Sequence, residues 1–153
     1  RNKGPLYHVS VSLNVHPLQP PCYTTYIRRG GIELGEAIAQ FKFSLDHRWG
    51  SLTMGGETTE ISRIMSNVDS STRHFKWDFN NVTMGWDCDA TRADNSPVWI
   101  VPDTEMTPIA SYIPPPDMWN PQPAVLTVSP DGHKDNLLDH IFVSALIINR
   151  KLS

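Results

Sequence analysis

The sequence predicts a mainly β protein with a single domain, residues 1–153, that ends in one buried helix. Three observations predict this class: many short segments alternate apolar and polar side chains, glycine and proline separate them, and a long apolar segment closes the chain. A chain of 153 residues can bury one substantial core and is short for two domains. The 9 glycines and 13 prolines are typical of strands joined by turns.

The amino-terminal half predicts a series of short strands. In the first, Val9, Val11 and Leu13 alternate with polar residues, which is the pattern of a half-buried strand. Gly30-Gly31 and Gly55-Gly56 predict turns, because glycine adopts positive φ at little cost. The predicted strands of this half are residues 7–15, 22–27, 37–45, 49–54 and 58–65.

The carboxyl-terminal half continues the alternation of apolar and polar residues up to about residue 129, where the strand pattern ends. Phe75, Trp77 and Phe79 share one face of a strand, and Asn80-Asn81 predicts a tight hairpin turn after them. A proline-rich loop, 114–123, is expected to be stiff and extended. The predicted strands here are residues 75–79, 82–86, 98–101, 109–113 and 124–128.

The segment of about 136–149 predicts a helix that is apolar nearly all round. Such a helix must be buried on nearly all sides, and its length of about 20 Å suits the bore of a small barrel. A buried strand is the alternative, because isoleucine and valine are frequent here. The economical arrangement is an antiparallel barrel, or a strongly curved sheet, wrapped around the helix, since closure removes exposed sheet edges.

Charge and composition exclude several classes of protein. The net charge of −3 and the 19% of charged residues argue against nucleic acid as a partner. No apolar run approaches the roughly 20 residues of a membrane-spanning helix. Cys22 and Cys88 allow one disulfide or two free thiols. No signal-like apolar region is visible, and the predicted compartment is cytoplasmic.

Several segments resemble a fungal family of single-domain proteins from mushroom-forming species, related to tubby C-terminal and LURP-like barrels. The resemblance covers about residues 37–151 and is carried by the segments 73–77, 85–87, 99–101, 109–110, 126–128 and 137–146. It implies a tubby-like antiparallel barrel around a central C-terminal helix. Tubby domains bind phosphoinositides through basic residues, whereas the 13 basic residues here are scattered.

Aromatic side chains are the first candidates for a binding site. The tryptophans crowd into one part of the chain, and the stiff proline-rich loop carries an apolar pair, Met118-Trp119, that would cover a barrel mouth. A place in the core beneath the loop is the competing interpretation. The candidate ligand-binding residues are Trp86, Trp99, Tyr112, Met118 and Trp119.

Histidines and carboxylates near the final helix are the candidates for a metal. These residue types bind Zn²⁺ or act as a general base, although acids at a helix start also serve as caps and dipole partners. The candidate metal ligands are His133, Asp135, Asp139 and His140. Asp87-Cys88-Asp89, with Asp94 nearby, is a second acidic turn that suits Ca²⁺ or Mg²⁺, or is simply solvated.

The leading functional hypothesis is a non-enzymatic binding protein for a small, partly apolar metabolite, for instance a pigment. It follows from the crowded aromatic residues and the absence of recognisable catalytic motifs such as Gly-x-Ser-x-Gly. The alternatives are a tubby-like membrane-lipid or protein adaptor and a metal-assisted hydrolase. The bound group would be a small metabolite or a divalent metal ion, contact with a membrane surface would be weak, and the chain would be a monomer or a homodimer.

Overall fold

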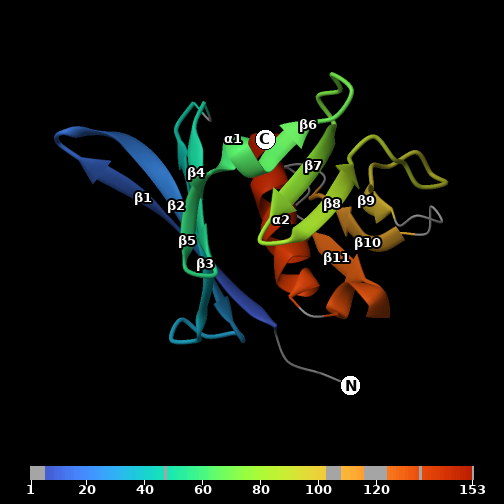
Figure 1. Cartoon of the computed structure of the whole chain (residues 1–153), viewed down its shortest axis with the longest axis horizontal. Helices are drawn as coiled ribbons and strands as arrows, with labels where there is room; N and C mark the ends of the chain where they lie inside the picture. Colours follow the sequence, from blue (N-terminus) through green and yellow to red (C-terminus); the bar gives the residue numbers. More distant parts are fainter. Residues whose placement is uncertain (1–5, 47, 103–107, 116–123, 135, 153) are drawn as a thin grey trace. The chain divides into compact units, whose positions relative to one another are not determined.

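The computed structural model describes residues 6–46, 48–102, 108–115, 124–134 and 136–152. Its contacts divide the chain into two compact units, Arg1–Ile64 and Met65–Ser153, hereafter the N-terminal and C-terminal units. In Figure 1 the N-terminal unit runs from blue to green and the C-terminal unit from green to red. The single domain expected from the sequence stays a prediction.

The N-terminal unit is one antiparallel sheet whose strands follow the chain order β1-β2-β3-β4-β5. Each strand joins the next through a hairpin, so every neighbour in sequence is a neighbour in the sheet. The strands are β1 (Tyr7–His16), β2 (Gln19–Arg29), β3 (Ala37–Ser44), β4 (Gly50–Met54) and β5 (Glu57–Glu60). The first four predicted strands are therefore confirmed, although β2 begins earlier than expected and includes Pro20 and Pro21 at the hairpin end.

Strand pairing sorts the side chains of this sheet onto two faces. One face is apolar: Ile27 pairs with Ala39, which pairs with Met54, and all three are buried. The other face is polar, because Ser10 pairs with Tyr26 and Tyr26 with Gln40. The alternation that predicts the strands thus also predicts which residues share a face.

The predicted strand 58–65 is confirmed only at its ends, because residues 58–60 lie in β5 and Met65 begins the next strand, and it is wrong for Ile61–Ile64. The chain leaves the sheet after β5 and forms a short helix, α1 (Ile61–Ile64), before β6 (Met65–Asn67). Ile61 and Ile64 are three residues apart, so one helical turn buries both, whereas a strand would point them to opposite faces. Burial of this pair outweighs the β propensity of isoleucine.

The C-terminal unit contains a second antiparallel sheet, in the order β11-β10-β9-β8-β7-β6. Its long hairpin joins β7 and β8 through Asn80 and Asn81, which both have positive φ as a tight turn requires. Phe75, Trp77 and Phe79 are buried on one face of β7, as predicted. The remaining strands are β7 (His74–Phe79), β8 (Val82–Asp87), β9 (Trp99–Pro102), β10 (Pro108–Ile113) and β11 (Val125–Val128).

A 3-10 turn, η1 (Pro130–His133), leads into the helix α2 (Leu137–Lys151). The helix prediction for residues 136–149 is confirmed, and the strand alternative is wrong. No residue from Leu137 to Arg150 is exposed, as expected for a helix that is apolar nearly all round. The N-cap is Asn136, while Asp135, the cap expected from the sequence, lies outside the described residues.

Two buried tryptophans of the second sheet bond to α2. Trp77 Nε1 donates to His140 Nδ1 at 3.1 Å, and Trp86 Nε1 donates to Ser144 Oγ at 2.8 Å. The helix lies beside β7 and β8 in Figure 1, which agrees with these contacts. Because His140 and Ser144 are four residues apart, one helix face presents both acceptors.

The protein is mainly β with one long C-terminal helix, as predicted. The strands that the structure describes form two open sheets of five and six strands, each with two edges. A closed barrel is therefore not seen in this part of the chain. Among the described residues, no helix is both long enough and apolar enough to cross a bilayer.

Candidate functional site

A polar cavity lies on the N-terminal unit, beside the paired strands β1 and β2. Its volume is about 280 Å³, and it is lined by His8, Ser10, Tyr26, Arg28, Glu33 and Leu34. The strand register explains the grouping, because His8 pairs with Arg28 and Ser10 with Tyr26 on the polar face. The loop between β2 and β3 supplies the other two residues.

His8, which lines this cavity, also carries a buried polar atom. Its Nδ1 is inaccessible to solvent and has no hydrogen-bond partner among the described residues. Leaving a buried polar group unpaired costs about 1–3 kcal/mol, so such atoms are normally paired in native proteins.

A second cavity of about 220 Å³ shares Tyr26 and Arg28 with the first. Its other lining residues belong to β2, β3, β4 and the turn that follows β4, and most of them are apolar or small; they are Ile27, Ala37, Ile38, Ala39, Gln40, Thr53, Met54, Gly55 and Gly56. The two cavities, hereafter the Tyr26–Arg28 site, are each slightly smaller than the roughly 300–1,000 Å³ of typical small-molecule sites.

Arg28 is held in place between the two cavities. Its guanidinium donates to the carbonyl oxygen of Gly35 at 3.3 Å, and the guanidinium has five N–H donors in all. A Cβ at Gly35 would collide with the carbonyl oxygen of Arg29, so the loop that holds Arg28 requires glycine. A planar guanidinium suits a carboxylate particularly well, because the two groups match in a bidentate pair.

The aromatic residues expected to bind a ligand lie elsewhere, in the C-terminal unit. Trp86 is a core residue that bonds to Ser144. Trp99 and Tyr112 pack together, with ring centroids 5.0 Å apart, and both are buried. The Trp99 indole N–H is also buried, and none of the residues that the structure describes accepts a hydrogen bond from it. Met118 and Trp119 lie outside the described residues, so their proposed role stays a prediction.

The residues expected to bind a metal near α2 are placed in different environments. His140 is 3% exposed and accepts the Trp77 indole N–H, while burial lowers the pKa of its imidazole. His133 is exposed in η1, and Asp139 is half-buried on α2. His133, Asp139 and His140 do not form a converging group of ligands among the described residues. Asp135 lies outside them, so the four-residue site is not tested.

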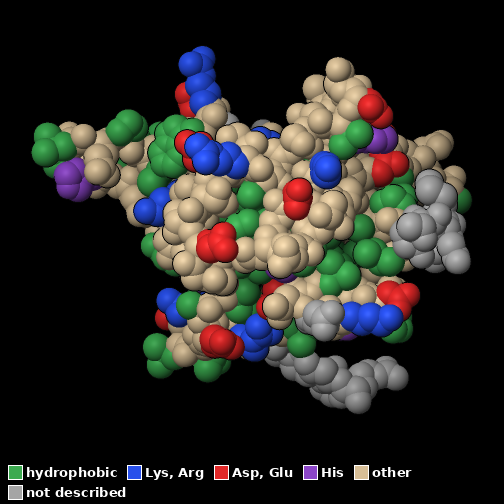
Figure 2. Space-filling view, in the orientation of Figure 1, with side chains coloured by type: hydrophobic (Ala, Val, Ile, Leu, Met, Phe, Trp, Pro, Cys, Tyr) green, Lys and Arg blue, Asp and Glu red, His purple; other side chains and the backbone are tan. Residues whose placement is uncertain are grey.

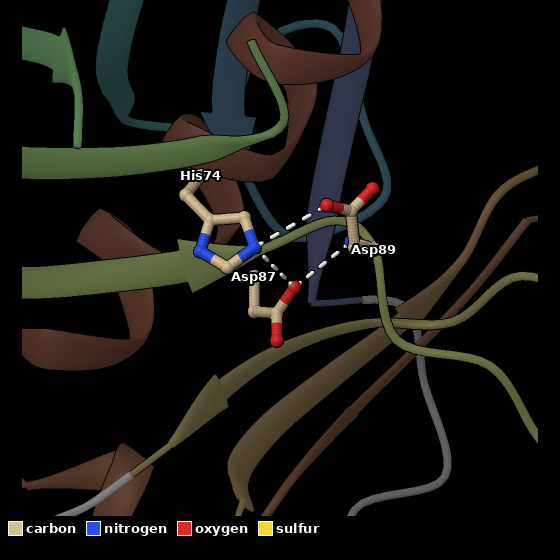
Figure 3. A group of neighbouring side chains, drawn as sticks. All are labelled: His74, Asp87 and Asp89. Atoms are coloured by element: carbon tan, nitrogen blue, oxygen red, sulfur yellow. Dashed lines mark hydrogen bonds and ion pairs between the residues drawn. The ribbon is translucent and has the colours of Figure 1, made fainter. Parts of the chain in front are cut away.

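A different group does converge at the end of the β7–β8 hairpin (Figure 3). His74 Nε2 lies 3.2 Å from Asp87 Oδ1 and 3.4 Å from Asp89 Oδ2. One ligand atom from each of the three residues lies within 4.8 Å of the others. The three residues, hereafter the His74 cluster, offer the nitrogen and oxygen ligands that Zn²⁺ takes.

The surroundings of the His74 cluster limit how strongly it would bind a cation. Arg73 Nε lies 3.2 Å from Asp89 Oδ1, so one carboxylate is already paired with a positive charge. Arg73 also donates to the carbonyl oxygen of Cys88, which fixes the guanidinium beside the cluster. Burial raises the pKa of the Cys88 thiol to about 12, so this free cysteine stays protonated and is a poor ligand.

The other acid of the predicted turn is separate from this cluster. Asp94 accepts hydrogen bonds from the backbone N–H and the hydroxyl of Ser96, and these bonds lower the pKa of its carboxyl. Its charge is further balanced by Arg92 at 3.8 Å. The acids that the sequence places in one turn therefore belong to two groups: Asp87 and Asp89 face His74, and Asp94 bonds to Ser96.

His74, Tyr26 and Arg28 were not recognised from the sequence, although signals for them exist. The turn at Asn80 and Asn81 sets the hairpin register, which places His74 opposite Asp87. Similarly, Tyr26 and Arg28 are two residues apart in a strand and so share a face. The cavity beside them depends on the loop after β2, which has no comparable signal.

Comparison with known protein families places the whole chain in one of them. The model of DUF6593, described as a family of unknown function, matches residues 1–153. The chain belongs to the DUF6593 family. No curated protein and no solved structure showed a significant match. Membership of DUF6593 assigns no activity, and the fungal origin and tubby-like relationship stay predictions.

Proposed function

We propose that this member of DUF6593 is a non-enzymatic binding protein for a small, partly apolar molecule that carries an acidic group. The ligand occupies the Tyr26–Arg28 site, with its acidic group on Arg28. The observation that carries the proposal is that two cavities share Tyr26 and Arg28 as lining residues, which sets a guanidinium beside both of them.

The two cavities are lined by different kinds of residues, and these linings indicate which chemical groups the ligand carries. The cavity with His8, Ser10 and Glu33 offers polar groups that fix orientation. The other cavity offers more apolar surface, to which the exposed Ala37 and the half-buried Ile38 contribute. Small-molecule sites usually combine apolar walls with a few polar groups in this way. The metabolite expected from the sequence, a pigment included, fits this description at a different place from the tryptophans.

The first test uses 8-anilinonaphthalene-1-sulfonate, a fluorescent dye with an apolar ring system and one anionic group. We expect one saturable site per chain and a loss of affinity of at least tenfold in Arg28→Ala, because the anion loses its partner. Arg63→Ala is the matched control, since Arg63 is an exposed arginine of α1 that does not line the site. Equal affinities for wild type and Arg28→Ala would refute the proposal.

The second test identifies the natural ligand. Protein purified from its source is examined by native mass spectrometry and by its absorption spectrum. We expect a mass above that of the polypeptide, which disappears on denaturation, and visible absorption if the ligand is a pigment. Protein that carries only the mass of the polypeptide at every stage of a gentle purification would argue against a tightly held metabolite.

A further inference from the structure

Among the described residues, no strand pairs with the outer edge of β1, which is therefore a long free edge. Within the five-stranded sheet it pairs with β2 alone, and its ten residues extend over about 33 Å. The other sheet edges in the described part of the chain are short: β5 and β11 have four residues each and β6 has three. Long unpaired edges offer a row of main-chain donors and acceptors to another strand.

The usual protections of an edge strand are missing from β1. Its sequence, YHVSVSLNVH, contains no Lys, Arg, Asp, Glu or Pro. The opposite edge of the same sheet, β5, is protected by exposed Glu57 and Glu60. The one irregularity in the β1–β2 register lies between Asn14 and His16, at the hairpin end, so the strand is regular before it.

An apolar stripe runs along this edge. Its members lie on one face of β1 and are 40–73% exposed; they are Val9, Val11, Leu13 and Val15. They continue the apolar face of the sheet, where the neighbouring Ile27 is only 1% exposed. Figure 2 shows hydrophobic side chains together with a histidine over the β1–β2 hairpin at the far left of the view, and no Lys, Arg, Asp or Glu at its tip.

We propose that β1 pairs antiparallel with β1 of a second copy of this chain, forming a symmetric dimer with a continuous ten-stranded sheet. A strand without Lys, Arg, Asp or Glu is self-complementary, because a two-fold axis brings none of these charges together; the titratable side chains that face each other in this pairing are His8 and His16 of the partner subunit. The register centred on Ser12 sets Val9 opposite Val15 of the partner subunit. It also sets Val11 opposite Leu13 of the partner subunit, so the two stripes match along their whole length.

This pairing involves one strand from each copy, so the interface is small. Interfaces below about 1,200 Å² are typical of weak association, and we expect a dissociation constant in the micromolar range. On the polar face, the same register sets Ser10 opposite Asn14 of the partner subunit. The dimer thus extends the face that carries the Tyr26–Arg28 site, although dimerisation requires no ligand there.

Sedimentation velocity over a wide concentration range tests the proposal on the full chain. We expect a reversible monomer–dimer equilibrium in wild type and a monomer at every concentration in Val11→Lys, where lysines would meet near the axis. Val125→Lys is the matched control, since Val125 is 46% exposed on the edge strand β11 against 50% for Val11. It should dimerise as wild type does.

Three results would overturn the proposal: a monomeric wild type, a dimer that persists in a folded Val11→Lys, or larger assemblies in place of a closed dimer. Cysteine cross-linking covers the case in which Val11→Lys fails to fold. In a Cys22→Ser background, Ser12→Cys should form a disulfide-linked dimer under mild oxidation, whereas Glu57→Cys on β5 should not. Equal cross-linking of the two cysteine variants would also contradict pairing through β1.

Discussion

Three buried tryptophans of the C-terminal unit differ in the hydrogen bonding of their indole N–H groups. The Trp77 and Trp86 indole N–H groups bond to His140 and Ser144, whereas that of Trp99 is buried with no acceptor in the described part of the chain. Unpaired buried groups are rare because each costs about 1–3 kcal/mol. The two satisfied indoles therefore make α2 sensitive to changes at His140 and Ser144.

His140 should make the stability of the protein depend on pH. Its Nδ1 accepts a hydrogen bond and burial lowers its pKa below 6.5, so the folded chain resists a proton that the unfolded chain takes up. The stability that His140 contributes is present above pH 6.5 and is lost as the pH falls below that value. We expect His140→Gln to be less stable than wild type at pH 7 by about 1–2 kcal/mol, with a smaller difference at pH 5.

Urea unfolding between pH 5 and pH 7 measures this effect. His133→Gln is the control, because His133 is exposed in η1 and its replacement should leave the pH dependence of wild type nearly intact. Parallel stability curves for wild type and His140→Gln would show that His140 is not responsible.

The His74 cluster makes a separate prediction about metal ions. We expect Zn²⁺ to bind once per chain with an affinity no better than micromolar, since Arg73 competes for Asp89. His74→Ala and Asp87→Asn should abolish this binding in calorimetric titrations. Asp94→Asn should not, because Asp94 bonds to Ser96 and not to the cluster. Undiminished Zn²⁺ binding in His74→Ala would place the metal elsewhere.

At the scale of elements, the hydrogen bond between Trp86 and Ser144 joins β8 to α2. Ser144 Oγ accepts the indole N–H and donates to the carbonyl oxygen of Ile141 at 3.0 Å. Ser144→Ala leaves the indole N–H buried and unpaired, so we expect a loss of about 1–3 kcal/mol of unfolding free energy. Chemical denaturation gives this value directly.

A double-mutant cycle separates the hydrogen bond from packing. Trp86→Phe removes the indole N–H, so Ser144→Ala should cost much less in that background. If Ser144→Ala lowered the free energy of unfolding equally in wild type and in Trp86→Phe, the hydrogen bond would contribute nothing to holding the helix on the sheet.

At the scale of the whole molecule, charge is the property that decides between partners. The net charge is −3, and at least six basic side chains of the described residues pair with carboxylates: Arg29, Arg48, Arg63, Arg73, Arg92 and Lys134. A surface of this kind does not concentrate positive charge, which is what anionic membranes attract.

We therefore expect no co-sedimentation with phosphatidylserine vesicles, or with vesicles containing phosphoinositides, at low ionic strength. Neutral phosphatidylcholine vesicles are the control. Binding to the anionic vesicles alone, weakened by added salt, would favour the tubby-like adaptor over the small-molecule binding protein.

Much of the secondary structure was predictable because it depends on local rules. Alternation identified β1 and β7, and the turn residues Gly55-Gly56 and Asn80-Asn81 adopt the positive φ expected of them. The middle of the predicted strand 58–65 is an exception. Ile61 and Ile64 form a helical turn there, because their burial outweighs the β propensity of isoleucine.

The candidate site was predictable only in part. The acids Asp87 and Asp89 were singled out from the sequence, but His74 is 13 positions before Asp87 and meets it only through strand pairing. The tryptophans suggested a binding site because they are large and crowded, yet Trp77 and Trp86 fill the core. An aromatic residue has the same sequence signature in a core as in a pocket.

By itself, the sequence determined the mainly β class, most strands and turns, and the buried C-terminal helix, since these follow from periodicity over a few neighbouring residues. Only the tertiary structure decided that the strands form two open sheets, that His8 lies beside Arg28, and that β1 keeps a free edge. The physical reason is that pairing and closure depend on contacts between distant segments, and alternation looks the same whichever strand becomes the neighbour.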